Sequence, residues 1–198
     1  MAIITGYVTL PTTNYLAWKT AVNGNGYNAD GYYGCQCWDL TAEFWYNVGF
    51  PQGYPQTGPN HYASECWTVS RVANAGDKFD LITNFADIKQ GDIIVWNGTS
   101  AYPTGHIGFA DEDYNPEKLR MINVLGQNQG TGGTPIPIFP ADGGSTANVK
   151  ALSLVDFAGA FRYKPWGSGP TPPTPSKKRG KFPWVLYARK LNQMRNGL

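Results

Sequence analysis

The order of local patterns along the chain constrains its fold more than any other feature of the sequence. Apart from a short β-like run over residues 3–10, the segments with helical signals come first, before residue 75. The apolar runs that follow are short and separated by turn residues at hairpin spacing. Helices followed by consecutive strands predict an α+β domain, in which N-terminal helices pack on an antiparallel β-sheet.

The predicted elements have recognisable ends. Asn14 is a suitable N-cap for a helix over residues 15–22, and Gly49 with Pro51 ends a second helix over residues 37–48. Glycine and asparagine dominate residues 23–34, which are therefore predicted to be a loop. The remaining predictions are a helix from Ser64 to about residue 74 and strands at 79–82, 93–96, 105–110, 119–125, 149–154 and 160–163.

Composition and charge divide the chain into three parts. Residues 1–164 carry all 14 acidic residues and nine Lys or Arg, a net charge of −5. The rest carries seven Lys or Arg and no acid, a net charge of +7. We predict a folded domain over 1–164, a Pro/Gly-rich linker over 165–180 and a basic amphipathic tail over 181–198. The positive charge makes the tail a candidate for binding an anionic partner, and nucleic acid is not expected.

Two classes of targeting segment are not predicted. A signal peptide would show a basic segment followed by an apolar one, and the sequence has no such pattern. No apolar run approaches roughly 18 residues, the length needed to span a membrane. Synthesis in the cytoplasm of a host cell is therefore expected, and action outside that membrane would require release by another component.

A cysteine at the start of a helix is the first candidate for chemistry. The stretch Gly34-Cys35-Gln36-Cys37-Trp38-Asp39-Leu40 joins the glycine-rich loop to the helix predicted over residues 37–48. Unpaired N–H groups at a helix N-terminus favour the thiolate, which is the nucleophilic form of cysteine. The chain has three cysteines, an odd number, and we expect reduced thiols. Cys35 and Cys66 are predicted to be buried small apolar residues.

A thiol hydrolase also needs an imidazole and a group that orients it. The chain has two histidines. His106 lies between two glycines at the start of an apolar strand, where small neighbours leave room for a substrate, whereas His61 lies in a polar loop. Asn128 follows the next strand and is a candidate to accept the imidazole N–H, although a turn asparagine is an equally simple interpretation.

Four segments in the same order resemble the CHAP domain, the cysteine- and histidine-dependent amidohydrolase/peptidase of phage lysins. They read GCQCWDL, GDIIVW, GHIGFA and VLGQNQ, and the resemblance covers residues 14–163. It implies a papain-like fold and hydrolysis of an amide bond in bacterial peptidoglycan, at the muramoyl–L-alanine bond or within the peptides. It also implies Cys37 as nucleophile, His106 as base and Asn128 as third residue, with Gln36 and Gln127 as oxyanion or substrate contacts. Gly126 stands where the family commonly has glutamate.

The loop before Cys37 predicts a calcium site. Asn28, Asp30, Tyr32 and Gly34 place oxygen donors at alternate positions, and Asp39 follows. Several CHAP lysins carry a similar pattern and bind calcium, with side-chain oxygens from the acidic positions and backbone oxygens from Tyr32 and Gly34. Asn28 in place of aspartate removes one charge. The simpler alternative is an Asx/Gly turn in which Asp39 complements the helix dipole.

Three hypotheses follow from these residues. The first is a phage endolysin or tail-associated lysin, in which a catalytic domain over 1–164 hydrolyses peptidoglycan at the bacterial cell wall. In this hypothesis the basic tail binds anionic wall polymers or virion proteins. The second is a non-catalytic structural or wall-binding protein on the same fold, which Gly126 favours and the joint presence of Cys37, His106 and Asn128 opposes. The third is a different papain-like hydrolase that acts on cytoplasmic peptides. The bond cleaved, the host and the oligomeric state are not determined by the sequence.

Overall fold

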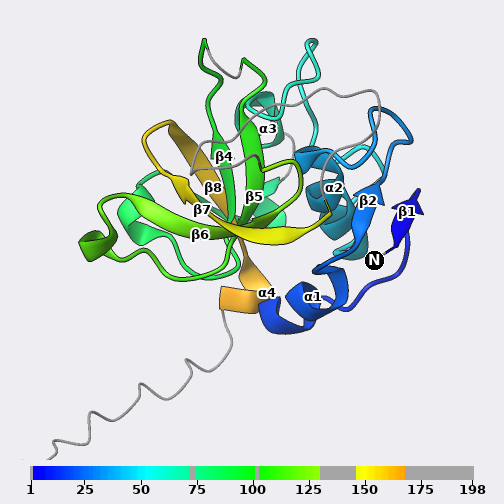
Figure 1. The fold of residues 1–198 in the computed structure, drawn as a ribbon, viewed down its shortest axis with the longest axis horizontal. Helices are drawn as coiled ribbons and strands as arrows, with labels where there is room; N and C mark the ends of the chain where they lie inside the picture. Colours follow the sequence, from blue (N-terminus) through cyan, green and yellow to red (C-terminus); the bar gives the residue numbers. More distant parts are fainter. Residues whose placement is uncertain (1, 72–74, 101–102, 130–145, 168–198) are drawn as a thin grey trace, which may run out of the picture.

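The computed structural model describes residues 2–71, 75–100, 103–129 and 146–167. Most of the predicted linker, the whole predicted tail and residues 130–145 lie outside this part. In the described part, helices lie beside one strongly curved sheet (Figure 1). The elements are β1 (Ile3–Thr5), α1 (Tyr15–Val22), β2 (Gly26–Asn28), α2 (Cys37–Asn47), α3 (Glu65–Ser70), η1 (Ala75–Asp77), β3 (Phe79–Ile82), η2 (Phe85–Asp87), β4 (Ile93–Trp96), β5 (His106–Ala110), η3 (Pro116–Lys118), β6 (Met121–Gly126), β7 (Asn148–Ser153), β8 (Phe157–Tyr163) and α4 (Lys164–Gly167).

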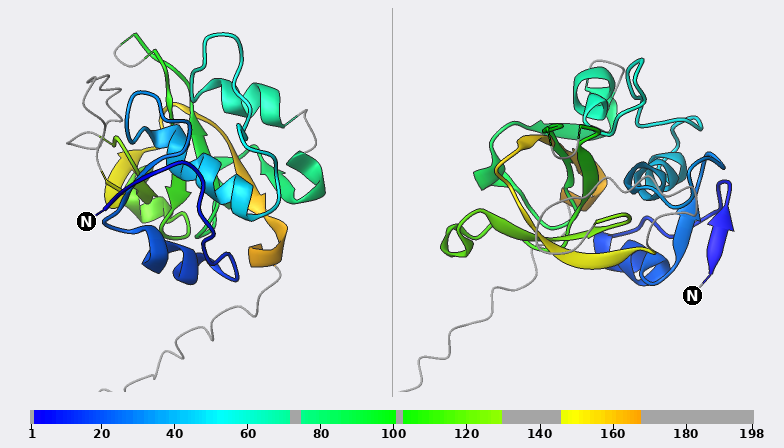
Figure 2. Two further views of the ribbon diagram at one scale, coloured as in Figure 1. Left: turned by 90° about the vertical axis from the view of Figure 1, so that its right-hand side faces the viewer. Right: turned by 45° about the horizontal axis from the view of Figure 1, so that its top comes forward.

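The main sheet is antiparallel, as predicted. Its six strands are ordered β3-β8-β4-β5-β6-β7, and every neighbouring pair runs in opposite directions. A second view shows how the sheet curls around its own axis while α1 and α2 lie on one side of it (Figure 2). The α+β architecture predicted from the order of the elements is therefore confirmed.

The central strands are buried on both faces. Ile93 and Val95 of β4 join the core shared with the helices, whereas Ile94 and Trp96 of the same strand join a second core inside the curled sheet. Alternate residues of a strand point to opposite faces, so an uninterrupted apolar run is what this position requires. The strand that carries His106 lies next to β4 in this doubly covered region.

The helix predictions held where local signals were strong. Helix α1 has the predicted limits, and the Asn14 side chain accepts the Ala17 N–H at 2.9 Å, as an N-cap does. Helix α3 is shorter than predicted and ends at Ser70. The β-like run over residues 3–10 yields a strand only over Ile3–Thr5.

The prediction of a continuous loop over residues 23–34 was wrong in one place. Residues Gly26–Asn28 form β2, which pairs in parallel with β1. Because this pairing joins two distant segments, the local composition did not reveal it. Gly26 is required by packing, since a Cβ there would lie 2.7 Å from the Cys35 sulfur.

The described part of the chain ends in the short helix α4, which covers Lys164–Gly167. Trp166 packs on Phe44 of α2 with 4.6 Å between ring centroids, and its Nε1 donates to the Thr12 carbonyl at 2.8 Å. These contacts connect the end of the described chain to the helical core. Residues 165–167, predicted as the beginning of the linker, therefore pack against the domain.

We expect Trp166→Ala to lower the free energy of unfolding by about 2 kcal/mol. Full truncation of a core tryptophan costs roughly 3–5 kcal/mol, and Trp166 is only partly buried. Denaturant unfolding of the full chain measures the loss. Leu119→Ala is the matched control, because Leu119 is 86% exposed. A loss for Trp166→Ala no larger than that of the control would contradict the packing described here.

Candidate active site

A buried carboxylate fixes the start of α2. Asp39 is 1% exposed, and its two oxygens accept the backbone N–H groups of Ala29 and Gln36, both at 2.8 Å. The Asp30 N–H lies 3.4 Å from the same carboxylate. The loop of residues 29–36 is thereby held against the first turn of the helix. Gln36 is the N-cap of this helix. Cys37 is the first helical residue, as expected from the helix predicted over residues 37–48.

His106 is the first residue of β5. His106 pairs with Trp96 of β4, and the two rings lie 5.4 Å apart between centroids. Gly105 precedes it with φ +65°, and a Cβ at that position would lie 2.4 Å from the Trp96 carbonyl oxygen. Only glycine fits there, so the glycine before His106 is a requirement of the backbone.

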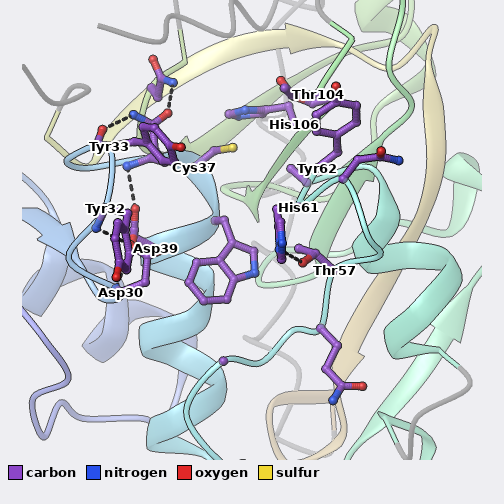
Figure 3. Close-up of a pocket in the computed structure, with 18 residues that line it drawn as sticks. Asp30, Tyr32, Tyr33, Cys37, Asp39, Thr57, His61, Tyr62, Thr104 and His106 are labelled. Atoms are coloured by element: carbon purple, nitrogen blue, oxygen red, sulfur yellow. Dashed lines mark hydrogen bonds between the residues drawn. The ribbon is translucent and has the colours of Figure 1, made fainter. Parts of the chain in front are cut away.

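Cys37 and His106 line one cavity of about 930 Å³, and Figure 3 shows the Cys37 sulfur directed toward the His106 ring. This volume is within the usual range of ligand pockets. Of the sequence-predicted site residues, Asp30, Tyr32, Gln36, Asp39 and Asn128 line it as well. Its other lining residues are Tyr33, Trp38, Gly53, Gln56, Thr57, Asn60, His61, Tyr62, Ala63, Thr104 and Gly105.

Burial favours the neutral form of both the Cys37 thiol and the His106 imidazole. It raises the pKa of Cys37 to about 11, although hydrogen bonds from the backbone of Ile107 and Trp38 act in the opposite direction. Burial lowers the pKa of His106 to about 4, and hydrogen bonding to Gln129 opposes this change. Each shift reflects the cost of one isolated charge. Proton transfer from sulfur to imidazole creates both charges together, and their mutual attraction offsets that cost.

The amide residues after β6 have different positions. The Asn128 Nδ2 donates to Gln36 Oε1 at 2.6 Å, which connects Asn128 to the residue before the thiol. Gln127 is fully buried, and its amide binds the backbone of Tyr27 and Gln36. Gln127 is not among the residues lining the cavity. The described geometry therefore gives Gln127 a structural role in place of the predicted substrate contact.

Sequence reasoning missed Gln129, the residue whose amide interacts with His106. Its side chain is 1% exposed, and the only signal in the sequence was a third amide after Gly126.

His61 and Asn128 share another feature that the sequence did not reveal. Both line the cavity with positive φ, as does Tyr33. Such backbone conformations are uncommon outside glycine and occur often at functional sites.

The predicted calcium residues fit a cation in two respects. Asn28 Oδ1 is buried without a hydrogen-bond partner. Asp39 is buried beside Asp30, and its pKa is raised to about 8, first by burial and then by the Asp30 charge. A cation would offset both effects. Within the described residues, no three His, Cys, Asp or Glu side chains gather as a metal cluster. Calcium here would therefore depend on amide and backbone oxygens.

Comparison with known proteins supports a relation to phage lysins. No protein-family model matches the chain. The D-alanyl-L-alanine endopeptidase of Streptococcus phage B30 is 29% identical over 119 residues, covering 59% of this chain. The match spans only 25% of that relative. The crystal structure of the wild-type endolysin LysIME-EF1 superposes with a TM-score of 0.56 and 22% identity, covering 81% of this chain and 67% of that one.

These matches show distant similarity to a phage endopeptidase and the fold of an endolysin. The α+β architecture was predicted from the sequence, and the coarse relation to phage lysins is confirmed. No helix in the described ranges has the length and apolar character to cross a bilayer.

The lowered pKa of His106 predicts how stability depends on pH. Its folded pKa of about 4 lies below the unfolded value of 6.5, so this contribution is complete above pH 6.5 and is lost as the pH falls toward 4. Between pH 7.5 and 4.5 we expect wild type to lose about 2 kcal/mol more than His106→Gln. Denaturant unfolding at both pH values measures this. His61→Gln is the control for removing a histidine, and equal losses in wild type and His106→Gln would contradict the prediction.

Proposed function

We propose that the protein is a peptidoglycan hydrolase that cleaves an amide bond with Cys37 as the nucleophile. The observation that carries the proposal is the approach of a helix N-terminal cysteine to a buried neutral histidine inside a large cavity. The similarity to a phage endopeptidase and the endolysin fold support this substrate class. The fold would then be the papain-like form of a CHAP domain, and the protein would act at the bacterial cell wall.

The proposed reaction proceeds by acyl transfer. His106 accepts the thiol proton, and the Cys37 sulfur attacks the carbonyl carbon of the scissile amide. The tetrahedral oxyanion is stabilised by backbone N–H groups at the start of α2, together with Gln36. His106 then donates the proton to the leaving amine, and a thioester remains. Finally, His106 removes a proton from water, which hydrolyses the thioester and regenerates the thiol.

We propose a peptide bond of the stem or cross-bridge as the scissile bond. The similar phage protein is named for cleavage between D-alanine and L-alanine. Mass spectrometry of digested walls separates the alternatives, because an amidase frees intact peptides from the glycan whereas an endopeptidase leaves part of each peptide attached. Release of whole stem peptides would contradict the choice of bond while leaving the thiol mechanism intact.

We also propose that Ca²⁺ binds the loop before α2, with side-chain oxygens from Asn28, Asp30 and Asp39. Backbone oxygens of Tyr32 and Gly34 complete the donor set. The buried unpartnered oxygen of Asn28 and the adjacent carboxylates support this assignment. The ion would neutralise the two carboxylates and restrain the loop that precedes Cys37. With two carboxylates among its donors, the site is expected to be weak.

We expect Cys37→Ala to abolish clearing of purified Gram-positive walls, a loss of at least about 10³-fold, because no other group replaces the nucleophile. Turbidity of wall suspensions measures the rate. Cys35→Ala is the matched control and should retain activity, since Cys35 is buried away from the cavity lining. Equal clearing by wild type and Cys37→Ala would overturn the mechanism. Wall binding without clearing by wild type would support the structural-protein alternative.

Calcium binding is tested by titration calorimetry on metal-free protein. We expect a dissociation constant weaker than about 10 µM, and loss of binding in Asp30→Ala. Asn28→Asp should tighten binding, because it adds a charge to the donor set. Asp113→Asn removes an exposed carboxylate and is the control. Unchanged affinity in both loop variants would place any calcium elsewhere.

A further inference from the structure

The side chain of Gln129 occupies the space that a side chain at residue 126 would fill. A Cβ built on Gly126 would lie 2.9 Å from Gln129 Oε1 and 3.0 Å from its Cδ. Gly126 is the last residue of β6, and its φ lies outside the left-handed region. The backbone at 126 therefore accepts any residue, and only the amide of Gln129 stands in the way. A side chain at residue 126 and the Gln129 side chain would therefore occupy the same space.

The orientation of the Gln129 amide is fixed by its surroundings. Its Nε2 donates to the carbonyl oxygens of Asn148 at 2.7 Å and Val124 at 3.1 Å. Carbonyl oxygens only accept hydrogen bonds, so rotating the amide by 180° would bring acceptors face to face. Oε1 must therefore point away from these carbonyls. It is buried there and has no completed hydrogen bond.

The histidine supplies the donor that this oxygen lacks. Hydrogen bonding to Gln129 favours the protonated form of His106, so the two side chains lie within reach of one another. The ring nitrogen Nε2 is buried and has no partner in the described part of the chain, and the same holds for Gln129 Oε1. A neutral imidazole has one N–H and one lone pair. If Nε2–H is directed at Gln129, the Nδ1 lone pair remains for the thiol.

We propose that Gln129 is the positioning residue of the active site: its Oε1 accepts the Nε2–H of His106 and fixes the tautomer whose Nδ1 can take the Cys37 proton. The proposal rests on the proposed thiol mechanism. It assigns to a neutral amide three residues beyond Gly126 the role that sequence reasoning gave to Asn128, whose amide instead binds Gln36. The hydrogen bond that one ring nitrogen of a histidine makes decides which of the two nitrogens carries the proton.

The tautomer is measured directly by ¹⁵N chemical shifts in protein labelled at histidine. The chain has two histidines, and His61→Gln assigns their signals. At pH 7.5 we expect the Nε2–H form of His106 in wild type. Gln129→Met keeps the volume of the side chain but removes the acceptor, so the Nδ1–H form should gain population.

A second variant moves the acceptor to the other position. In Gly126→Glu/Gln129→Ala, a carboxylate from residue 126 enters the vacated space, and the Nε2–H form should return. This variant also keeps the proposal testable if Gln129→Met does not fold, because it retains a polar group at the same place. A wild type in the Nδ1–H form, or the same tautomer populations in wild type and Gln129→Met, would overturn the proposal.

The rate of Cys37 alkylation by iodoacetamide at pH 7.5 gives a functional readout that needs no wall substrate. We expect an approximately tenfold loss in Gln129→Met, the size of one hydrogen bond to a group that becomes charged, and recovery in the double variant. Gln90→Met changes an exposed amide in the loop before β4 and is the matched control. Peptide mapping assigns the labelled cysteine. Because both readouts are independent of wall cleavage, they distinguish failure of this assignment from failure of the proposed function.

Discussion

The carboxylate of Asp39 is the contact on which the site depends. It replaces water around a buried charge with backbone N–H groups from Ala29 and Gln36, and it lies in the first turn of α2, where the helix dipole favours an anion. Its raised pKa shows that these donors do not fully offset burial next to Asp30. A cation near the loop would offset this cost, in agreement with the proposed calcium site. Asp39 thus links the position of Cys37 to the cation site that we propose.

The sheet makes an equally necessary contribution. Because β4 and β5 are covered on both faces, the His106 ring is held against Trp96 in a medium of low polarity. Such a medium penalises a lone thiolate and a lone imidazolium, and both pKa shifts follow from it. It also strengthens the attraction between the two charges once a proton has moved. The neutral forms of both side chains are therefore favoured at rest, and in the proposed reaction the ion pair is the reactive form.

Sequence reasoning succeeded where the signal was local. Asn14 capped α1 as predicted, and the apolar runs became strands with boundaries shifted by at most three residues. It failed where structure depended on a distant partner. Strand β2 exists only because β1 pairs with it, and the packing of Trp166 on Phe44 joins two segments far apart in the sequence. The same distinction applies within the site. Cys37 and His106 follow from their immediate neighbours, whereas the partner of His106 depends on how the chain turns after β6.

The replacement of a side chain at residue 126 by one from residue 129 has a chemical consequence. A carboxylate and an amide both accept an N–H, so both can select the same histidine tautomer. Only the carboxylate also stabilises the imidazolium by charge, and only the carboxylate adds a buried anion that itself needs compensation. With Gln129, the site keeps orientation and gives up part of the electrostatic stabilisation. The thiolate of the ion pair must then be stabilised to a larger extent by the backbone N–H groups of Ile107 and Trp38, which lie at the sulfur. Such a site depends more on the exact placement of the first turn of α2, and hence on Asp39, than one with a second carboxylate beside the histidine.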